Sequence, residues 1–155
     1  GIFKEAKQSG LHVTIHAGEW GPAENVREAI ENIGAERIGH GVRVLEDDSV
    51  VALAKERGTV FEVCVTSNFQ SGVVSSLEAH PLPTMFEKGL KVTINTDDPS
   101  ISRITLANEY QIVCDKLHVS VNELKKSVLI AAESAFLKDD EKETLTVSLK
   151  KELKL

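Results

Sequence analysis

The sequence predicts an α/β protein whose strands run parallel, with helical segments between one strand and the next. Four short apolar runs, rich in β-branched residues, are each followed by a stretch with helix signals. These runs end at His16, His40, Ser67 and Asp97, at intervals of about 24 to 30 residues, which suits one strand-plus-helix unit. The units share this outline rather than their residues, so we expect a single domain over residues 1–155.

The composition is that of an ordinary globular chain, with 41% hydrophobic and 27% charged residues. The net charge is −6 and the two signs are mixed along the chain, which argues against a nucleic-acid-binding or basic membrane-binding surface. No apolar run approaches membrane-spanning length, and residues 1–10 are typical of a polar helix end rather than a signal peptide. Cys64 and Cys114 form no metal-ligand motif, so we expect reduced thiols in a cytoplasmic protein.

The first strand is expected over residues 11–17, after a helix end over residues 1–9. Alternation along this strand places His12, Thr14 and His16 on one face. We expect His12 to be packed within the strand and His16 to lie at its carboxyl end. In parallel α/β proteins, ligands and chemistry collect at that end.

The remaining elements follow from apolar periodicity and from capping residues. Up to the last strand we expect a helix over 22–33, a strand over 36–41, a helix that begins at 47–49 and ends at Gly58, a strand over 59–65, a long loop over 69–83, a short helix over 84–88 and a strand over 90–95. A loop of that length is often functional. Beyond the last strand we expect helices over 105–118 and 120–136, the second opened by the capping box of Ser120 and Glu123, and a charged terminal helix over 137–155.

Groups that can bind a metal or transfer a proton gather at the expected strand ends. They are His16, Glu19, His40, Asp97 and Asp98, with Ser67 and Asn68 between them. Zinc takes imidazole and carboxylate ligands and keeps one position for water, whose pKa it lowers to about 7. By residue type His16 and Asp97 suit ligation, whereas Glu19 and His40 suit proton transfer and Asp98 suits a hydrogen bond to a polar substrate.

Each of these residues also has a simpler interpretation. His16 can be a buried strand residue, His40 a turn residue between glycines, and residues 97–99 a turn that begins a helix. His80 and His118 are expected to be solvated, in a loop and at a helix end. The recurrence of the pattern at successive strand ends favours the functional interpretation.

The motifs at these strand ends resemble the adenosine deaminase family in order and spacing. They are His16-Ala-Gly-Glu19, Arg37-Ile-Gly-His40-Gly41, Thr66-Ser67-Asn68 and Asn95-Thr-Asp97-Asp98-Pro99, supported by Phe69-Gln-Ser-Gly72 and His80-Pro-Leu82. The resemblance extends over most of residues 10–135. It implies a (β/α)8 TIM barrel with zinc at its carboxyl rim, of which this chain would be the C-terminal half: strands five to eight and the C-terminal helices.

The resemblance also implies a role for each rim residue. His16 and Asp97 would be Zn²⁺ ligands, and Asp97 would also hold the attacking water. Glu19 would protonate the purine N1 in its acid form, His40 would orient or deprotonate the water that attacks C6, and Asp98 would hydrogen-bond N7. The reaction would convert adenosine, a small purine nucleoside, to inosine and ammonia.

Two positions bear on the substrate. Adenine-specific relatives usually carry Asp where Gly39 stands and Ser where Thr96 stands, so the resemblance favours the nucleoside over adenine. A nucleotide such as AMP would call for basic residues near the rim motifs, and none cluster there. Val65 also stands where the family often has proline, which would affect loop stiffness more than chemistry.

The larger departure is that no His-X-His pair occurs in the sequence. In the family that pair lies on the first strand and supplies two zinc ligands, so the resemblance implies that this chain alone is inactive. Three outcomes stay open for the missing strands, the N-terminal half of the barrel. They can lie on a separate chain or outside this sequence, the chain can be a poorly soluble fragment, or two copies can close a barrel by pairing their open strand edges. The remaining alternative is a binding or assembly fragment that keeps the rim residues as relics.

Overall fold

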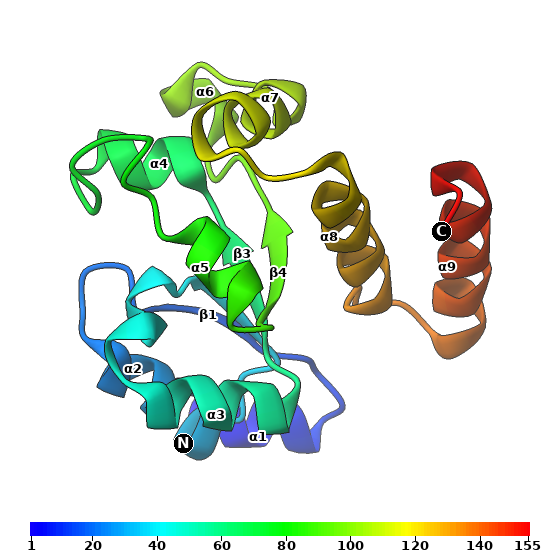
Figure 1. Ribbon diagram of the computed structural model, residues 1–155. Coiled ribbons are helices and arrows are strands. Elements are labelled where there is room, and N and C mark those ends of the chain that lie inside the picture. The colour runs from blue at the N-terminus through cyan, green and yellow to red at the C-terminus, as the bar shows by residue number, and fades with distance from the viewer.

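The computed structural model describes residues 1–155, and its four strands form one parallel sheet in sequence order (Figure 1). The strands are β1 (Thr14–Ala17), β2 (Arg37–His40), β3 (Val60–Val63) and β4 (Lys91–Ile94). His16 lies opposite Gly39, Gly39 opposite Glu62, and Glu62 opposite Thr93. The parallel arrangement predicted from the strand-plus-helix units is therefore confirmed.

The expected helices are present with slightly different bounds. They are α1 (Ile2–Gln8), α2 (Ala23–Glu28) continued by the π-helical turn η1 (Ala29–Ile33), α3 (Asp48–Arg57), α5 (Leu82–Glu87), α7 (Leu106–Leu117), α8 (Val121–Glu133) and the surface helix α9 (Asp139–Leu153). Local capping explains several starts. Asp47 accepts a hydrogen bond from the Ser49 amide at α3, and the capping box of Ser120 and Glu123 opens α8.

Two short helices were not predicted, η2 (Val42–Glu46) and α4 (Val65–Gln70), whereas α6 (Pro99–Ser102) begins where the simpler interpretation of residues 97–99 places a helix start. In the second case the third strand ends at Val63, two residues earlier than expected, and residues 66–68 lie in a helix rather than in a strand end. The apolar run misleads because Val65 is fully buried, as a strand residue would be, although it packs into the core from α4. The first strand is also shorter than expected and begins at Thr14.

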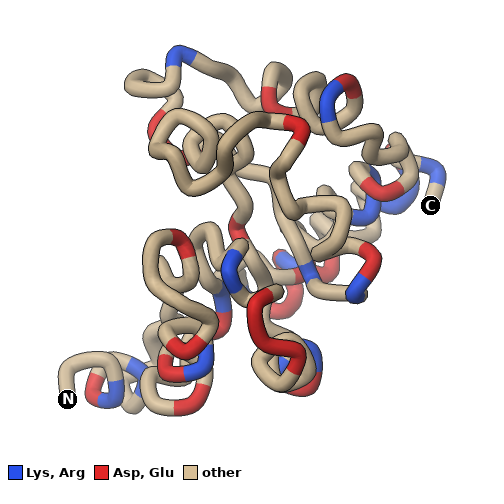
Figure 2. Tube along the Cα trace, turned by 60° about the vertical axis from the view of Figure 1, so that its left-hand side comes forward, with Lys and Arg blue, Asp and Glu red and all other residues tan.

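Positions of Lys and Arg are interspersed with positions of Asp and Glu along the chain, as Figure 2 shows. None of the helices has both the length and the hydrophobicity that crossing a bilayer requires.

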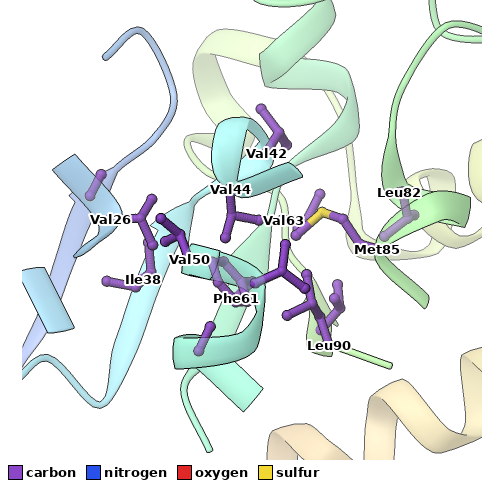
Figure 3. Close-up of a cluster of buried hydrophobic side chains, with 14 of the residues drawn as sticks. Val26, Ile38, Val42, Val44, Val50, Phe61, Val63, Leu82, Met85 and Leu90 are labelled. Atoms are coloured by element: carbon purple, nitrogen blue, oxygen red, sulfur yellow. The ribbon is translucent and has the colours of Figure 1, made fainter. Parts of the chain in front are cut away.

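The two faces of the sheet differ in burial. Ile38, Phe61 and Val92 point to the face covered by helices and are fully buried. Figure 3 shows Phe61 among other side chains of this core, including those of Val50, Val63 and Leu90. On the opposite face, Thr14 and His16 of β1 are exposed. On the same face of β4 the side chain of Thr93 is buried, so this second face of the sheet is open at β1 and covered at β4.

At the amino ends of the strands, the ring of Phe136 links the segment after α8 to the sheet. It stacks on His12 with ring centroids 4.4 Å apart, and the Arg37 guanidinium lies 3.7 Å from its centroid. His12 Nδ1 lies 2.8 Å from Glu36 Oε2. The prediction of a packed strand residue is wrong for His12, because it precedes β1 and its side chain is 48% exposed.

Candidate active site

The end of β1 supplies His16 and, after a glycine turn, Glu19. Gly18 has φ +67°, and a Cβ atom there would collide with Val26 and crowd Gly41. Only glycine suits this turn, because it combines a left-handed conformation with a close approach of neighbouring chain. The turn brings the Glu19 side chain back toward the sheet, where it is 16% exposed.

His40 ends β2 in a left-handed conformation with φ +62°, which costs an ordinary residue about 1–2 kcal/mol. Its ring is almost fully buried and lies edge-on to the His16 ring, with centroids 4.8 Å apart. A Cβ atom at Gly39 would collide with the His16 imidazole. The glycine therefore leaves room for the two rings at the end of the sheet.

The rim residues predicted from sequence converge here. One ligand atom each from His16, Glu19 and His40 lies within 4.8 Å of the others. Asp97, with φ +58° after β4, places Oδ2 4.0 Å from His40 Nε2. Ser67 Oγ donates to the same Asp97 oxygen at 2.7 Å. Imidazole and carboxylate donors of this kind suit Zn²⁺, so the residues present fit that ion.

Asp98 lies beside this cluster with a bond pattern of its own. Its Oδ1 accepts hydrogen bonds from the Ser100 and Ile101 amides, at 3.0 and 3.1 Å, and caps α6. The helix-start interpretation of Asp98 is thus realised, and its contact with a substrate stays a prediction.

Burial controls the charge of His40. Loss of hydration lowers the pKa of His40, and the nearby Glu19 carboxylate only partly opposes that effect. The neutral imidazole is therefore favoured. Glu19 and His40 also approach each other directly, with Oε2 and Nε2 3.6 Å apart.

Two buried side chains lie behind His40: Asn68, which the sequence places among the strand-end groups without a role, and His80, which was expected in solvent. Asn68 Nδ2 lies 3.1 Å from His40 Nδ1, and Asn68 Oδ1 lies 3.1 Å from His80 Nε2. The Leu82 amide donates to His80 Nδ1 at 3.1 Å. The prediction that His80 is solvated is wrong, because the loop folds over α4 and leaves it 3% exposed. The available signal was the polar cluster of residues 66–68 after the third strand.

A third buried group supports the start of α4. Glu109 Oε1 accepts from the Thr66 amide at 3.1 Å, and the Glu109 side chain is fully buried on α7. Burial raises the pKa of Glu109, so its acid form is favoured. Nearby, burial raises the pKa of Cys64 to about 12, and both cysteines are free thiols, as expected.

A family model described as adenosine deaminase matches residues 1–152.

The chain belongs to the adenosine deaminase family.

Members with this name include a protein of Aliivibrio fischeri (strain ATCC 700601 / ES114), 40% identical over 143 residues. A second, from Escherichia coli O157:H7, is 38% identical over 143 residues. Each alignment covers 92% of this chain and 43% of the relative. The chain therefore spans less than half the length of these adenosine deaminases.

Solved structures agree with the family assignment. An adenine deaminase from Arthrobacter aurescens matches with a TM-score of 0.92 and 32% identity, over 99% of this chain and 47% of its own. An amidohydrolase from Burkholderia ambifaria, described with bound Zn, matches with a TM-score of 0.90 and 26% identity, over 98% and 43%. The N6-mAMP deaminase of Arabidopsis matches with a TM-score of 0.82 and 26% identity, over 96% and 43%. The predicted relation to the TIM-barrel deaminases is confirmed, and the open sheet corresponds to part of such a barrel.

Proposed function

We propose that this chain forms the C-terminal half of an adenosine deaminase, which hydrolyses adenosine to inosine and ammonia. The observation that carries the proposal is the convergence of His16, Glu19, His40 and Asp97 at the carboxyl ends of parallel strands. Catalytic residues of TIM barrels lie at this end of the strands. The names of the 38–40% identical relatives support the same reaction.

His16 and Asp97 would hold Zn²⁺ in this proposal. The ion, when bound, lowers the pKa of a coordinated water toward 7 and so supplies a nucleophile at neutral pH. A catalytic zinc site uses about three protein ligands. The sequence has no His-X-His pair to add to these two, so we expect this chain to be inactive until another polypeptide completes the set.

The chain's own residues would handle the protons. Glu19, at the mouth of the site and only slightly exposed, would donate a proton to the purine N1. His40 would hold the attacking water beside Asp97, and the Ser67 hydroxyl fixes the Asp97 carboxylate in place. Asp98 would donate a hydrogen bond to the purine N7 through the carboxyl oxygen not used in its cap, because N7 offers only a lone pair.

Two observations favour adenosine over adenine or AMP as the proposed substrate. Gly39 packs against the His16 ring, so the Asp of adenine-specific relatives would require that ring to move. The nearest rim groups are carboxylates, which repel the phosphate of a nucleotide. We also propose a cytoplasmic location, because Cys64 and Cys114 are both free thiols, which suit a reducing compartment.

The test combines metal analysis with an absorbance assay for deamination. The chain is assayed with adenosine, adenine and AMP, alone and mixed with the N-terminal half of the Aliivibrio fischeri relative. We expect no product from the chain alone and inosine from the mixture, with stoichiometric zinc in the active complex. Faster deamination of adenine or AMP than of adenosine would assign that compound as the substrate instead. A complex that forms without zinc or product would favour the binding-fragment alternative.

A further inference from the structure

The hydrogen bonds behind His40 run in one fixed direction, which begins at the Leu82 amide. That N–H donates to His80 Nδ1 at 3.1 Å, and a backbone amide can only donate. His80 Nδ1 must therefore carry a lone pair, so the proton of the neutral ring lies on Nε2. Burial lowers the pKa of His80 to about 4, so the ring is neutral at physiological pH.

The side chain of Asn68 is the next member of this series of hydrogen bonds. His80 Nε2 lies 3.1 Å from Asn68 Oδ1, so the histidine N–H donates to the amide oxygen. This bond fixes which end of the amide faces His40. Asn68 Nδ2 then donates to His40 Nδ1 at 3.1 Å, and His40 Nδ1 is the acceptor at the end of the series.

Water cannot easily replace any member of this series. Asn68, His40 and His80 are 0%, 1% and 3% exposed, although they come from α4, the end of β2 and the loop before α5. Buried polar groups are costly to leave unpaired, so a reversal of one bond would leave donors or acceptors unsatisfied along the series. The protein thus favours one arrangement of these protons.

We propose that Asn68 and His80 are positioning residues that hold His40 with its proton on Nε2, directed at Glu19 and Asp97. His40 Nε2 lies 3.6 Å from Glu19 Oε2 and 4.0 Å from Asp97 Oδ2. The role of this tautomer in deamination rests on the function proposed above. The tautomer itself follows from the hydrogen bonds alone.

The first consequence concerns metal binding. A histidine that binds zinc through Nε2 carries its proton on Nδ1 and donates it to a carboxylate or carbonyl. At His40 that place is taken by the Asn68 amide, which is itself a donor. His40 is therefore not a ligand, although it lies in the same cluster as His16 and Glu19.

The second consequence concerns catalysis. The sequence left open whether His40 orients the attacking water or deprotonates it. With a proton already on Nε2, neutral His40 donates a hydrogen bond to that water. The proton of the water then passes to a carboxylate at the rim, for which Asp97 is placed.

The test is an NMR measurement on the metal-free chain with ¹⁵N-labelled histidines at neutral pH. Long-range ¹H–¹⁵N correlations distinguish protonated from unprotonated ring nitrogens, and H40Q assigns the His40 signals. We expect an unprotonated Nδ1 and a protonated Nε2 at His40. A protonated Nδ1, or a mixture of the two tautomers, overturns the proposal. Because this readout needs no activity, its failure is distinct from a failure to deaminate adenosine.

A matched pair of variants tests the cause. N68D replaces the amide donor with a carboxylate acceptor of the same size, so His40 Nδ1 should become protonated. N108D adds the same charge at the α7 capping box, far along the chain from His40, and should leave the His40 signals unchanged. An unprotonated Nδ1 in folded N68D contradicts the proposal, and the wild-type spectrum decides the matter if that variant does not fold.

Discussion

The two ends of the strands carry similar residue types in different arrangements. At the amino ends, Glu36 pairs with His12 and Lys7, and Arg37 at the start of β2 pairs with Glu62 of β3 at 3.1 Å. At the carboxyl ends the carboxylates of Glu19 and Asp97 have no Lys or Arg partner and face an imidazole instead. Charges neutralised within the fold contribute to its stability, whereas charges left available to a ligand are suited to chemistry. Variants at the two ends should therefore have different kinds of effect.

The largest effect is expected from H16A at the carboxyl end. In the complex completed by an N-terminal half, H16A should lower kcat/KM for adenosine at least about 100-fold, because an expected zinc ligand is lost. The free energy of unfolding of the chain should change by less than about 0.5 kcal/mol, because His16 is exposed. Steady-state kinetics and urea unfolding measure the two effects. If H16A lowered the stability without lowering the activity, the carboxyl ends of the strands would have a structural role and not a catalytic one.

S67A should have a smaller effect of the same kind. It removes the 2.7 Å hydrogen bond that fixes Asp97, so zinc affinity of the completed enzyme should fall about 10-fold. Competition with a chelating dye measures this change. S76A, which removes only a turn hydrogen bond to the Ala79 amide, is the control and should leave the affinity unchanged. Equal affinities for S67A and wild type would show that Asp97 needs no such support.

F136A at the amino ends should change stability rather than chemistry. The variant loses the stacking on His12 and the contact with the Arg37 guanidinium, together worth about 1–2 kcal/mol. Urea unfolding should show this loss, while zinc affinity in the completed enzyme stays within twofold. F69A removes another partly exposed phenylalanine, near the carboxyl ends, and provides the comparison. A change in zinc affinity with F136A would mean that the two ends are coupled.

The smallest effect concerns Glu109, which lies behind the carboxyl ends. Its pKa is raised by burial above the ordinary value of 4.5, so the folded state holds its proton more tightly than the unfolded state. This contribution to stability is complete below pH 4.5 and is lost as the pH rises through the folded-state pKa. E109Q keeps an acceptor for the Thr66 amide and cannot ionise, so unfolding free energy should depend less on pH above 4.5.

The control for E109Q has the opposite sign. Hydrogen bonds from Ser120 lower the pKa of Glu123, so its contribution is present above pH 4.5 and is lost in acid. E123Q should therefore alter the pH dependence only at the acidic end. Urea unfolding measured over a series of pH values separates the two variants. An unchanged pH dependence in E109Q would mean that Glu109 ionises as freely in the folded state as in the unfolded state.

The sequence was most informative where chemistry coincides with a local pattern. His16, His40 and Asp97 each follow an apolar run, so their meeting at one sheet edge could be predicted from parallel pairing alone. Helix bounds were predictable for the same reason, since caps such as Ser120 act over three residues. The glycine turn before Glu19 likewise follows from local residue types.

The supporting residues could not be predicted in the same way. His80 is 12 residues from Asn68 along the chain, and Glu109 is 43 residues from Thr66. Their burial depends on how a loop and α7 pack over α4. Such packing between distant segments leaves no repeating pattern of hydrophobic residues in the sequence from which it could be predicted. The buried Val65 had the opposite effect, because its hydrophobicity suits a strand as well as a helix.

The outer strands of the sheet, β1 and β4, each have one neighbour only. Their free sides offer a row of backbone donors and acceptors, and His16 stands on the first of them. A polypeptide that adds strands on both sides would enclose the polar face and shield it from solvent in the same step. Assembly and the formation of a low-dielectric reaction chamber would then be one thermodynamic event. The affinity of the chain for that polypeptide would include the free energies of both.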